Sequence, residues 1–362
     1  MRKHYIFLFI SAVLLSGCQS QFGPNGLANT HPAYNQSIVN TLSQEMLLNL
    51  VRLKYNDEPY FLTINSITAS LSLIGSAGVN STVDLGPATG SLSPTLGVTY
   101  SDIPIIAYQP LQGIDYLKSV LSPIPLESLL VLSQSGWDID RLFGLCIERI
   151  NNISNAPNAS GPTPKIEPEL EKFKYLLSLL KEFQLKGEIN IGPSVFDEKK
   201  LVMFFEISKE SQDLKDKITN LLSLKSTTED KFYVEIGTNF INTDVNKITM
   251  RTRSVSSLMY YLSQGIEAPE EHLDKGLINI TKAKNGSMFN WAQSPVGEYF
   301  NVKVSEFYPN NAFLAVSYRG YWFYIADNDL ISKSTFMLLT LLFNLQAGQT
   351  SFSSPSLTIP VR

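Results

Sequence analysis

The sequence predicts an α+β fold in which antiparallel β-meanders or hairpins combine with several short helices and a buried C-terminal helix. Three observations predict it. Apolar residues recur at helical spacing in many short segments, other segments alternate apolar and polar residues as strands do, and the last long segment is apolar on nearly all sides. The chain has 362 residues, 44% of them hydrophobic, which is enough for one large domain or two smaller ones.

The N-terminus has the three parts of a secretory signal. The basic start MRKH precedes the apolar run YIFLFISAVLL and the small residues SG. This run is shorter than the about 20 residues that a membrane-spanning helix needs. Residues 1–17 are therefore predicted to be a lipoprotein signal peptide that is removed.

Cys18 follows this signal directly. The stretch Leu15-Ser16-Gly17-Cys18 resembles the bacterial lipobox. The resemblance implies cleavage before Cys18, a diacylglyceryl thioether on its sulfur and a third acyl chain, such as palmitate, on its amine. Several acyl chains make attachment to a membrane stable. Gln19 in place of aspartate implies the outer membrane, on either its periplasmic or its surface face. The alternative is an ordinary secretory signal with a chance cysteine.

The first part of the mature chain is predicted to be a tether and a helix. Residues 18–36 are polar and rich in Gly, Pro and Asn, so they predict a tether that spaces the folded body from the membrane. A helix is predicted over 37–55, with Pro59 at or beyond its end. Its apolar residues group on one side: Ile38, Leu42, Met46, Leu47, Leu50, Val51 and Leu53.

Residues 63–101 form the most unusual segment. Asp84 is its one charged residue, and apolar positions alternate with Ser, Thr and Asn over much of its length. Glycines at 75, 78, 86 and 90 predict turns, and therefore two or three strands of about ten residues.

Two interpretations of this segment remain open. In a soluble domain it is a meander with one face packed on helices and the small hydroxyl face in water. Uncharged strands of this length, apolar outward and small-polar inward, also suit an outer-membrane barrel. A few strands cannot close a barrel, whereas hairpins from several subunits can. The analogy is with lipidated secretion channels that assemble as rings.

Three short helices and a linker are predicted next. The helices cover 113–122, 125–134 and 137–150, and Asp138 and Asp140 are interpreted as residues of a helix start rather than as an acid–base pair. Residues 151–168 are rich in Asn, Ser and Pro and predict a linker between a region 37–150 and a C-terminal α+β region 169–362.

The C-terminal region mixes helices and strands. Helices are predicted up to Gly187, over 209–222 and over 253–266, and strands over 188–192, 201–207, 231–237 and 246–251. A hairpin is predicted to turn at Arg319-Gly320. The last helix carries Phe336, Leu338, Leu339 and Leu342, is placed at the centre of the core, and makes a poor membrane span.

The search for chemical sites yields no catalytic residue, cofactor site or metal site. Cys146 lies on an apolar helical face and is interpreted as a core residue. A cation cluster of His272 with Glu270, Glu271 and Asp274 is weighed against a solvated loop. Two further matches, the S-x-x-K of Ser178 and Lys181 and the acidic triplet 327–329, are interpreted as chance and as a helix N-cap.

The charge balance argues against nucleic acid as a partner. Removing residues 1–17 lowers Lys plus Arg from 29 to 27 against 33 Asp plus Glu, so the mature chain carries a formal charge of −6. A mildly acidic protein does not attract phosphate backbones. The predicted partners are the membrane, through lipidated Cys18, and further proteins or copies of the chain.

Segments spread over most of the mature chain resemble an uncharacterised family of Gram-negative bacterial lipoproteins. They are NLVRLKYNDEPYFL, YQPLQGIDYLKSVLSPIPLESLLVLSQSGWDIDRL, RTRSVSSLMYYLSQGIEAP and YRGYWFYIADNDLISKSTFMLLTLLFNLQ. The resemblance supports the lipoprotein prediction and implies no activity or site residue.

The predicted function is a non-catalytic structural or assembly component of the cell envelope. One alternative is a lipid-anchored oligomeric pore or secretion-channel subunit that uses the 63–101 hairpins. Others are an envelope hydrolase, or a binding module that uses the aromatic residues Trp291, Trp322, Tyr318 and Tyr321.

Overall fold

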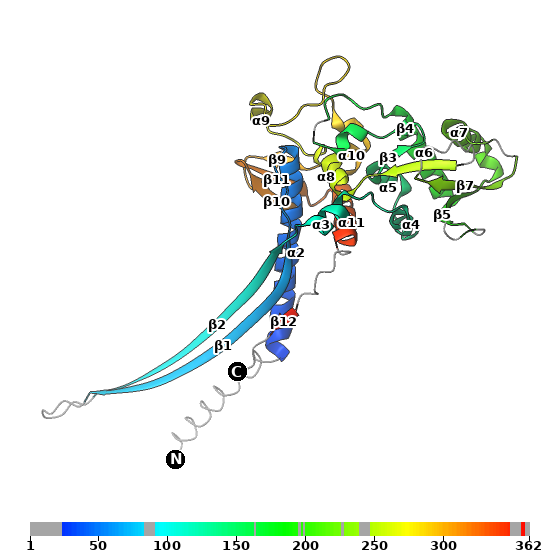
Figure 1. Ribbon diagram of the computed structural model, residues 1–362. Coiled ribbons are helices and arrows are strands. Elements are labelled where there is room, and N and C mark those ends of the chain that lie inside the picture. The colour runs from blue at the N-terminus through cyan, green and yellow to red at the C-terminus, as the bar shows by residue number, and fades with distance from the viewer. Residues whose placement is uncertain are drawn as a thin grey trace. The chain divides into compact units, whose positions relative to one another are not determined.

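The computed structural model has the predicted α+β fold, built from antiparallel sheets and helices (Figure 1). It describes residues 24–82, 91–162, 164–194, 197, 200–225, 228–238, 247–347 and 356–358. The predicted signal peptide, Cys18 and residues 19–23 of the predicted tether lie outside the described residues. The chain divides into two compact units, one from Met1–Pro59 and Leu121–Phe343 and a smaller one from Tyr60–Val120 and Asn344–Arg362.

The predicted N-terminal helix is confirmed as α2 and is longer than expected. It spans Pro24–Lys54, so it includes much of the segment predicted to be a tether. Proline is well suited to the first turn of a helix, because its φ is already helical and its missing N–H is not needed there. Residues 32–42 are mostly exposed, including Leu42, although the apolar stripe predicted for this helix begins at Ile38. The last turns bury Leu47, Leu50 and Val51 and pack against α8 (Val255–Ser263) and β10 (Ala312–Tyr318).

The larger unit contains a six-stranded sheet. Its order is β4 (Ile153–Ser154), β3 (Ile147–Ile150), β8 (Lys247–Thr252), β7 (Lys231–Gly237), β6 (Leu201–Glu206) and β5 (Ile189–Pro193). Neighbouring strands are antiparallel except β7 and β8. Helix α6 (Glu171–Lys186) packs against β5 and ends at Gly187, whose φ of 70° makes the left-handed cap that the sequence predicts.

The three short helices are α3 (Ile114–Leu121), α4 (Leu126–Gln134) and α5 (Ile139–Cys146). The prediction that the third helix continues to residue 150 is wrong, because the chain changes to strand β3 at Ile147. The β-branched Ile147 and Ile150 suit a strand and are buried in the sheet.

Residues 151–168, predicted to be a linker, lie within the larger unit. They contain β4 and the 3₁₀-helix η1 (Pro157–Ser160). Asn155 is fully buried, and its amide donates to the carbonyl oxygens of Gly144 and Ile147 at 2.7 Å each. The polar composition of this segment wrongly predicts a solvated linker. The Asn155 amide is instead satisfied by backbone carbonyls inside the protein.

The predicted C-terminal hairpin is confirmed. Strands β10 and β11 (Tyr321–Ala326) pair around Arg319 and Gly320, whose φ values of 49° and 90° are those of a type I′ turn. Strand β9 (Lys303–Ser305) pairs with the other edge of β11. Tyr318 is only half-buried, whereas Phe323 and Ile325 are fully buried.

The last helix is α11 (Leu330–Ala347), and it begins as predicted. Oδ1 of Asp329 accepts a hydrogen bond from the backbone N–H of Ser332 at 3.0 Å, an N-cap. The helix is not buried on all sides: Phe336, Leu338 and Leu339 are buried, while Met337 and Leu341 are about half exposed. Among the described residues α11 is the one helix with the length and composition of a membrane span, but a half-buried core helix passes the same test.

The smaller unit contains a long hairpin. Strands β1 (Leu62–Thr82) and β2 (Ser91–Pro110) pair antiparallel along their whole lengths, with one irregularity between Ile64 and Ser66 (Figure 1). Gly75 and Gly78 lie inside β1, opposite Val98 and Thr95, so the prediction of turns at these two glycines is wrong. The predicted turns at residues 86 and 90 lie outside the described residues.

Candidate functional site

The β1–β2 hairpin has two faces of different composition. Directly opposed residues of an antiparallel pair belong to the same face of the sheet. The register therefore assigns to one face the positions Ile67, Ala69, Leu71, Leu73, Gly75, Ala77, Val79 and Ser81, together with Leu92, Pro94, Leu96, Val98, Tyr100, Asp102, Pro104 and Ile106. The alternation in the two strands is thus in phase, and one face is almost entirely apolar.

The opposite face is small and polar over the part of the hairpin next to the 82–91 connection. Its paired positions there include Ser72 with Ser101, Ser76 with Gly97, and Thr82 with Ser91, and Ile74 is the exception. Ser76, Thr95 and Thr99 are exposed. Asp102 is the one charged residue in the two strands. Sheets that face water in soluble proteins normally carry more charged side chains, whereas uncharged strands with one apolar and one small polar face are typical of outer-membrane barrels.

The edges of the hairpin are covered unevenly. In the sheet order β12-β1-β2, strand β2 lies at one edge of the described residues. Strand β12 (Ser356–Thr358) pairs in parallel with β1 only at Ser66–Thr68. Pro94 and Pro104 lie on β2, which suits an edge strand because proline cannot donate to a ladder. An exposed strand edge is a template for pairing with another chain, although each proline on it removes one hydrogen bond from such pairing.

A second candidate is a partly buried polar and aromatic cluster between α2, the short helix α9 (Glu270–Asp274) and the β10–β11 turn. His272 is buried, and its Nδ1 lies 2.6 Å from the Tyr55 hydroxyl. Asp57 accepts hydrogen bonds from Tyr318 and, at 2.8 Å, from Arg319. Burial lowers the pKa of His272 and raises the pKa of Tyr55 to about 12.

Two residues of the cation cluster considered in the sequence, Glu271 and His272, have protein partners. Glu271 is hydrogen-bonded to the Tyr321 hydroxyl at 2.9 Å and pairs with Lys275. The described residues include no group of three His, Cys, Asp or Glu side chains that could hold a metal. Through its hydrogen-bond contact with Tyr55, His272 ties the end of α2 to α9.

The position of His272 predicts a pH-dependent stability. A histidine whose pKa is lowered by folding binds its proton more readily in the unfolded chain, so the free energy of unfolding falls as the pH drops below the usual value of about 6.5. The slope is at most about 1.4 kcal/mol per pH unit for one proton. We expect urea unfolding between about pH 7.5 and pH 5.5 to show this slope.

Two substitutions check the assignment. His272→Gln should remove the slope, whereas His31→Gln, nearer the start of α2, should keep it. An unchanged slope in His272→Gln would assign the pH dependence to other groups.

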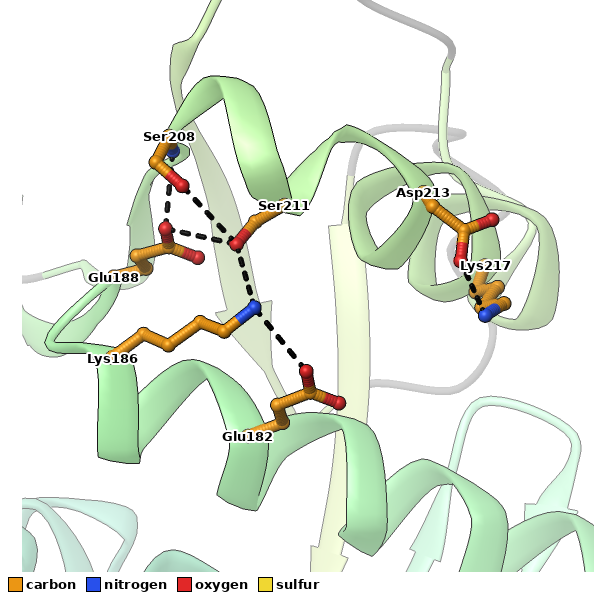
Figure 2. Close-up of polar contacts among 7 residues, drawn as sticks. All are labelled: Glu182, Lys186, Glu188, Ser208, Ser211, Asp213 and Lys217. Atoms are coloured by element: carbon orange, nitrogen blue, oxygen red, sulfur yellow. Dashed lines mark hydrogen bonds and ion pairs between the residues drawn. The ribbon is translucent and has the colours of Figure 1, made fainter.

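A third cluster surrounds Glu188, between α6 and the start of α7 (Gln212–Leu222) (Figure 2). Glu188 is buried, and its Oε1 accepts hydrogen bonds from the Ser208 N–H at 3.1 Å and the Ser211 hydroxyl at 3.0 Å. Nζ of Lys186 donates to the Ser211 hydroxyl at 3.0 Å and pairs with Glu182 at 3.2 Å. Although burial opposes ionisation, the hydrogen bonds from both serines lower the pKa of Glu188.

The Ser211–Lys186 contact has the residue types of a serine nucleophile with a lysine base. Ser211, however, has no exposed surface, so a substrate cannot contact it in this conformation. The cluster therefore anchors the chain that enters α7. No local pattern in the sequence links residues 186–188 with residues 208–211, which is why it was not predicted.

Asp140 belongs to a separate ion pair. It is buried in the first turn of α5 and accepts hydrogen bonds from Lys181 at 2.6 Å and from the Tyr299 hydroxyl, on α10 (Pro295–Tyr299), at 2.7 Å. Asp138 occupies the N-cap position but makes no capping hydrogen bond with its side chain. Ser178 donates to the Tyr175 carbonyl of its own helix at 2.7 Å. Ser178 and Lys181 of the S-x-x-K match therefore bond to different partners, Tyr175 and Asp140.

The aromatic residues considered for a binding surface are distributed among different contacts. Tyr318 and Tyr321 bond to Asp57 and Glu271, as described above. The Trp322 ring lies 4.9 Å, centroid to centroid, from that of Tyr308. Trp291 packs edge-on against Tyr261 and Phe289 and donates to the Thr281 hydroxyl at 3.3 Å.

Cys146 is the core residue that the sequence indicates. It is fully buried, and burial raises the pKa of its thiol to about 12. A thiol with this pKa remains protonated and unreactive near neutral pH. Cys18, the predicted lipidation site, lies outside the described residues. Comparisons with protein-family models, with curated proteins and with solved structures gave no match.

Proposed function

We propose that this protein is a lipid-anchored, non-catalytic structural subunit of the outer membrane, in which β1–β2 hairpins from several copies form a membrane-inserted β-barrel. One observation carries the proposal. Two strands of 21 and 20 residues contain one charged residue, Asp102, and they pair in a register that gathers the apolar positions on one face. Outer-membrane barrels have this composition, apolar toward lipid and polar toward the lumen.

The requirement for several copies follows from the backbone. Hydrocarbon cannot hydrogen-bond to the exposed N–H and C=O groups at a strand edge, so only a closed barrel avoids the cost. One hairpin has two edges and cannot close on itself. Identical hairpins placed head to tail pair the β2 edge of one copy with the β1 edge of the next and close into a ring.

The predicted anchor fits this arrangement. Five residues separate Cys18 from Pro24, so a lipidated Cys18 would keep the start of α2 within about 20 Å of the bilayer surface. Helix α2 has 31 residues and a length of about 46 Å. The spacer between membrane and folded body is then largely a helix rather than a flexible tether.

A hydrolase has less support. The buried carboxylates Asp140 and Glu188 lie in separate clusters, and each accepts hydrogen bonds from donors of the chain itself, although Oε2 of Glu188 has no hydrogen-bond partner. A glycan- or lipid-cleaving site needs acidic groups that face a substrate.

The proposal is tested by removing the hairpin. One variant replaces Ser66–Ala107, which are opposed in the register, with a short Gly-Ser turn in a Cys18→Ala background. The matched control is Cys18→Ala with the hairpin intact. We expect the control to need detergent and to form a heat-sensitive oligomer, and the deletion to be a soluble monomer, as measured by light scattering with and without heating.

The opposite result is decisive. A soluble, monomeric Cys18→Ala protein with an intact hairpin would exclude the barrel. Labelled palmitate should enter the unmodified chain and not the Cys18→Ala variant, which tests the anchor separately from the assembly.

A further inference from the structure

The β1–β2 hairpin is about twice as long as one membrane crossing requires. Strands of 21 and 20 residues extend over about 65–70 Å at 3.3 Å per residue. A tilted barrel strand crosses the hydrocarbon with about 9–11 residues. If the hairpin enters a membrane, as the proposed function requires, about half of it must lie elsewhere.

Charge marks one boundary within the hairpin. Asp102 lies opposite Leu71 on the apolar face. A carboxylate on the lipid-facing side is unfavourable in hydrocarbon, so the membrane segment must end before this pair. Asp84 comes two residues after Thr82 in the sequence, and Thr82 with Ser91 is the last pair among the described residues. The two aspartates therefore enclose an uncharged segment of about ten residues in each strand.

The residue types change at the same place. Tyr100, opposite Leu73, is the next position on the apolar face, and tyrosine is enriched where barrel strands leave the hydrocarbon. On the other face, the small polar positions of β2 end at Ser101, and Ile103 and Ile105 follow, opposite Ser70 and Thr68 of β1. Ile105 is 61% exposed. In β2, the alternation of apolar and small polar residues thus belongs only to the half of the strand next to the 82–91 connection.

The position of strand β12 is an independent observation that divides the hairpin into the same two halves. It covers the β1 edge at Ser66–Thr68, which lie on the far side of Leu71 and Asp102 from the uncharged segment. Strand β2 pairs with one edge of β1. Among the described residues, no strand pairs with the opposite edge of β1 between Ala69 and Thr82. An edge covered within the chain is unavailable to a second copy, so pairing between copies is confined to the uncharged half.

We infer that Leu73–Thr82 and Ser91–Tyr100 form the membrane-crossing half of the hairpin and pair with the same segments of neighbouring copies. The other half, Leu62–Leu71 with Asp102–Pro110, stays in water with β12 on its edge. Charge, residue type and edge cover all place the division between the Leu71–Asp102 and Leu73–Tyr100 pairs.

Two alanines on the same face of β1 provide a matched test. Ala77, opposite Leu96, lies in the uncharged half, and Ala69, opposite Pro104, lies in the other half. Single Ala77→Cys and Ala69→Cys proteins are labelled with an environment-sensitive fluorophore and reconstituted into phosphatidylethanolamine–phosphatidylglycerol vesicles. The unmodified chain serves as the labelling blank, because Cys146 is fully buried.

We expect brominated lipid to quench the label at position 77 several-fold more strongly than the label at position 69, and iodide to show the reverse preference. Strong quenching of both labels by lipid would overturn the inference and leave the barrel standing. Quenching of neither label by lipid would overturn the proposed function itself. Lipid quenching at position 69 alone would place the wrong half in the membrane and overturn the inference.

Discussion

Replacing Arg253 with methionine is expected to lower the free energy of unfolding by about 3 kcal/mol, the largest single-residue effect in the larger unit. Arg253 is 1% exposed, and its guanidinium donates to the carbonyl oxygens of Leu145 at 3.0 Å and Ile147 at 2.9 Å. It also donates to the Asn155 carbonyl and to the Ser160 hydroxyl, and it stacks 3.9 Å over the Tyr261 ring.

The cost arises from the groups that methionine would leave behind. The carbonyls at the end of α5 carry the negative end of the helix dipole, and a buried cation is well placed there. Burial lowers the pKa of Arg253, because the charged guanidinium loses hydration, and the hydrogen-bond acceptors around it offset this desolvation cost. Methionine fills a similar volume but donates no hydrogen bond, so the carbonyls would be left unsatisfied in the core.

Arg251→Met is the matched control. Arg251 lies two residues earlier, and its side chain is 57% exposed beside Glu148. We expect this change to cost less than about 1 kcal/mol, as surface ion pairs do. Urea unfolding followed by tryptophan fluorescence measures both variants. Equal effects at the two positions would contradict the structural role assigned to Arg253.

Local patterns predicted those elements whose cause lies within a few residues. Helix α6 shows an apolar stripe and ends at a glycine, and the β10–β11 hairpin turns at Arg319-Gly320, where a glycine accepts a positive φ. These features need no knowledge of the rest of the chain.

Features that depend on distant segments were not predictable. The sequence places Arg253 only at the first position of the helix predicted over 253–266. Its burial is not predictable, because its acceptors are backbone carbonyls about 100 residues away, which carry no sequence signature. Asn155 and the Glu188 cluster were missed for the same reason. A polar side chain that is buried against backbone groups looks, in sequence, like one on the surface.

One property of the β1–β2 hairpin was predictable from the sequence and another was not. Its faces follow from alternation alone, and the register confirms that the apolar positions of β1 oppose those of β2. Its length does not follow, because glycine supports turns in most contexts and Gly75 and Gly78 instead continue the ladder. Only the pairing shows that the segment is two long strands.

Replacing Leu96 with arginine is expected to abolish the oligomer. Leu96 lies opposite Ala77, at the centre of the uncharged half and on the apolar face. An arginine on the lipid side of a barrel costs about 2–4 kcal/mol at the bilayer midplane. Each copy in a ring would carry this cost, so the effect on assembly grows with the number of subunits.

Thr95→Arg provides the control, because Thr95 is the adjacent residue at nearly the same depth but lies opposite Gly78 on the small polar face. A lumen-facing arginine meets water, so we expect the heat-sensitive oligomer to persist and its conductance in planar bilayers to shift toward anions. The two variants add the same charge one residue apart and differ only in the face that carries it. Loss of the oligomer in both variants, or in neither, would show that the two faces do not meet different solvents, and the assignment of lipid to the apolar face would fail.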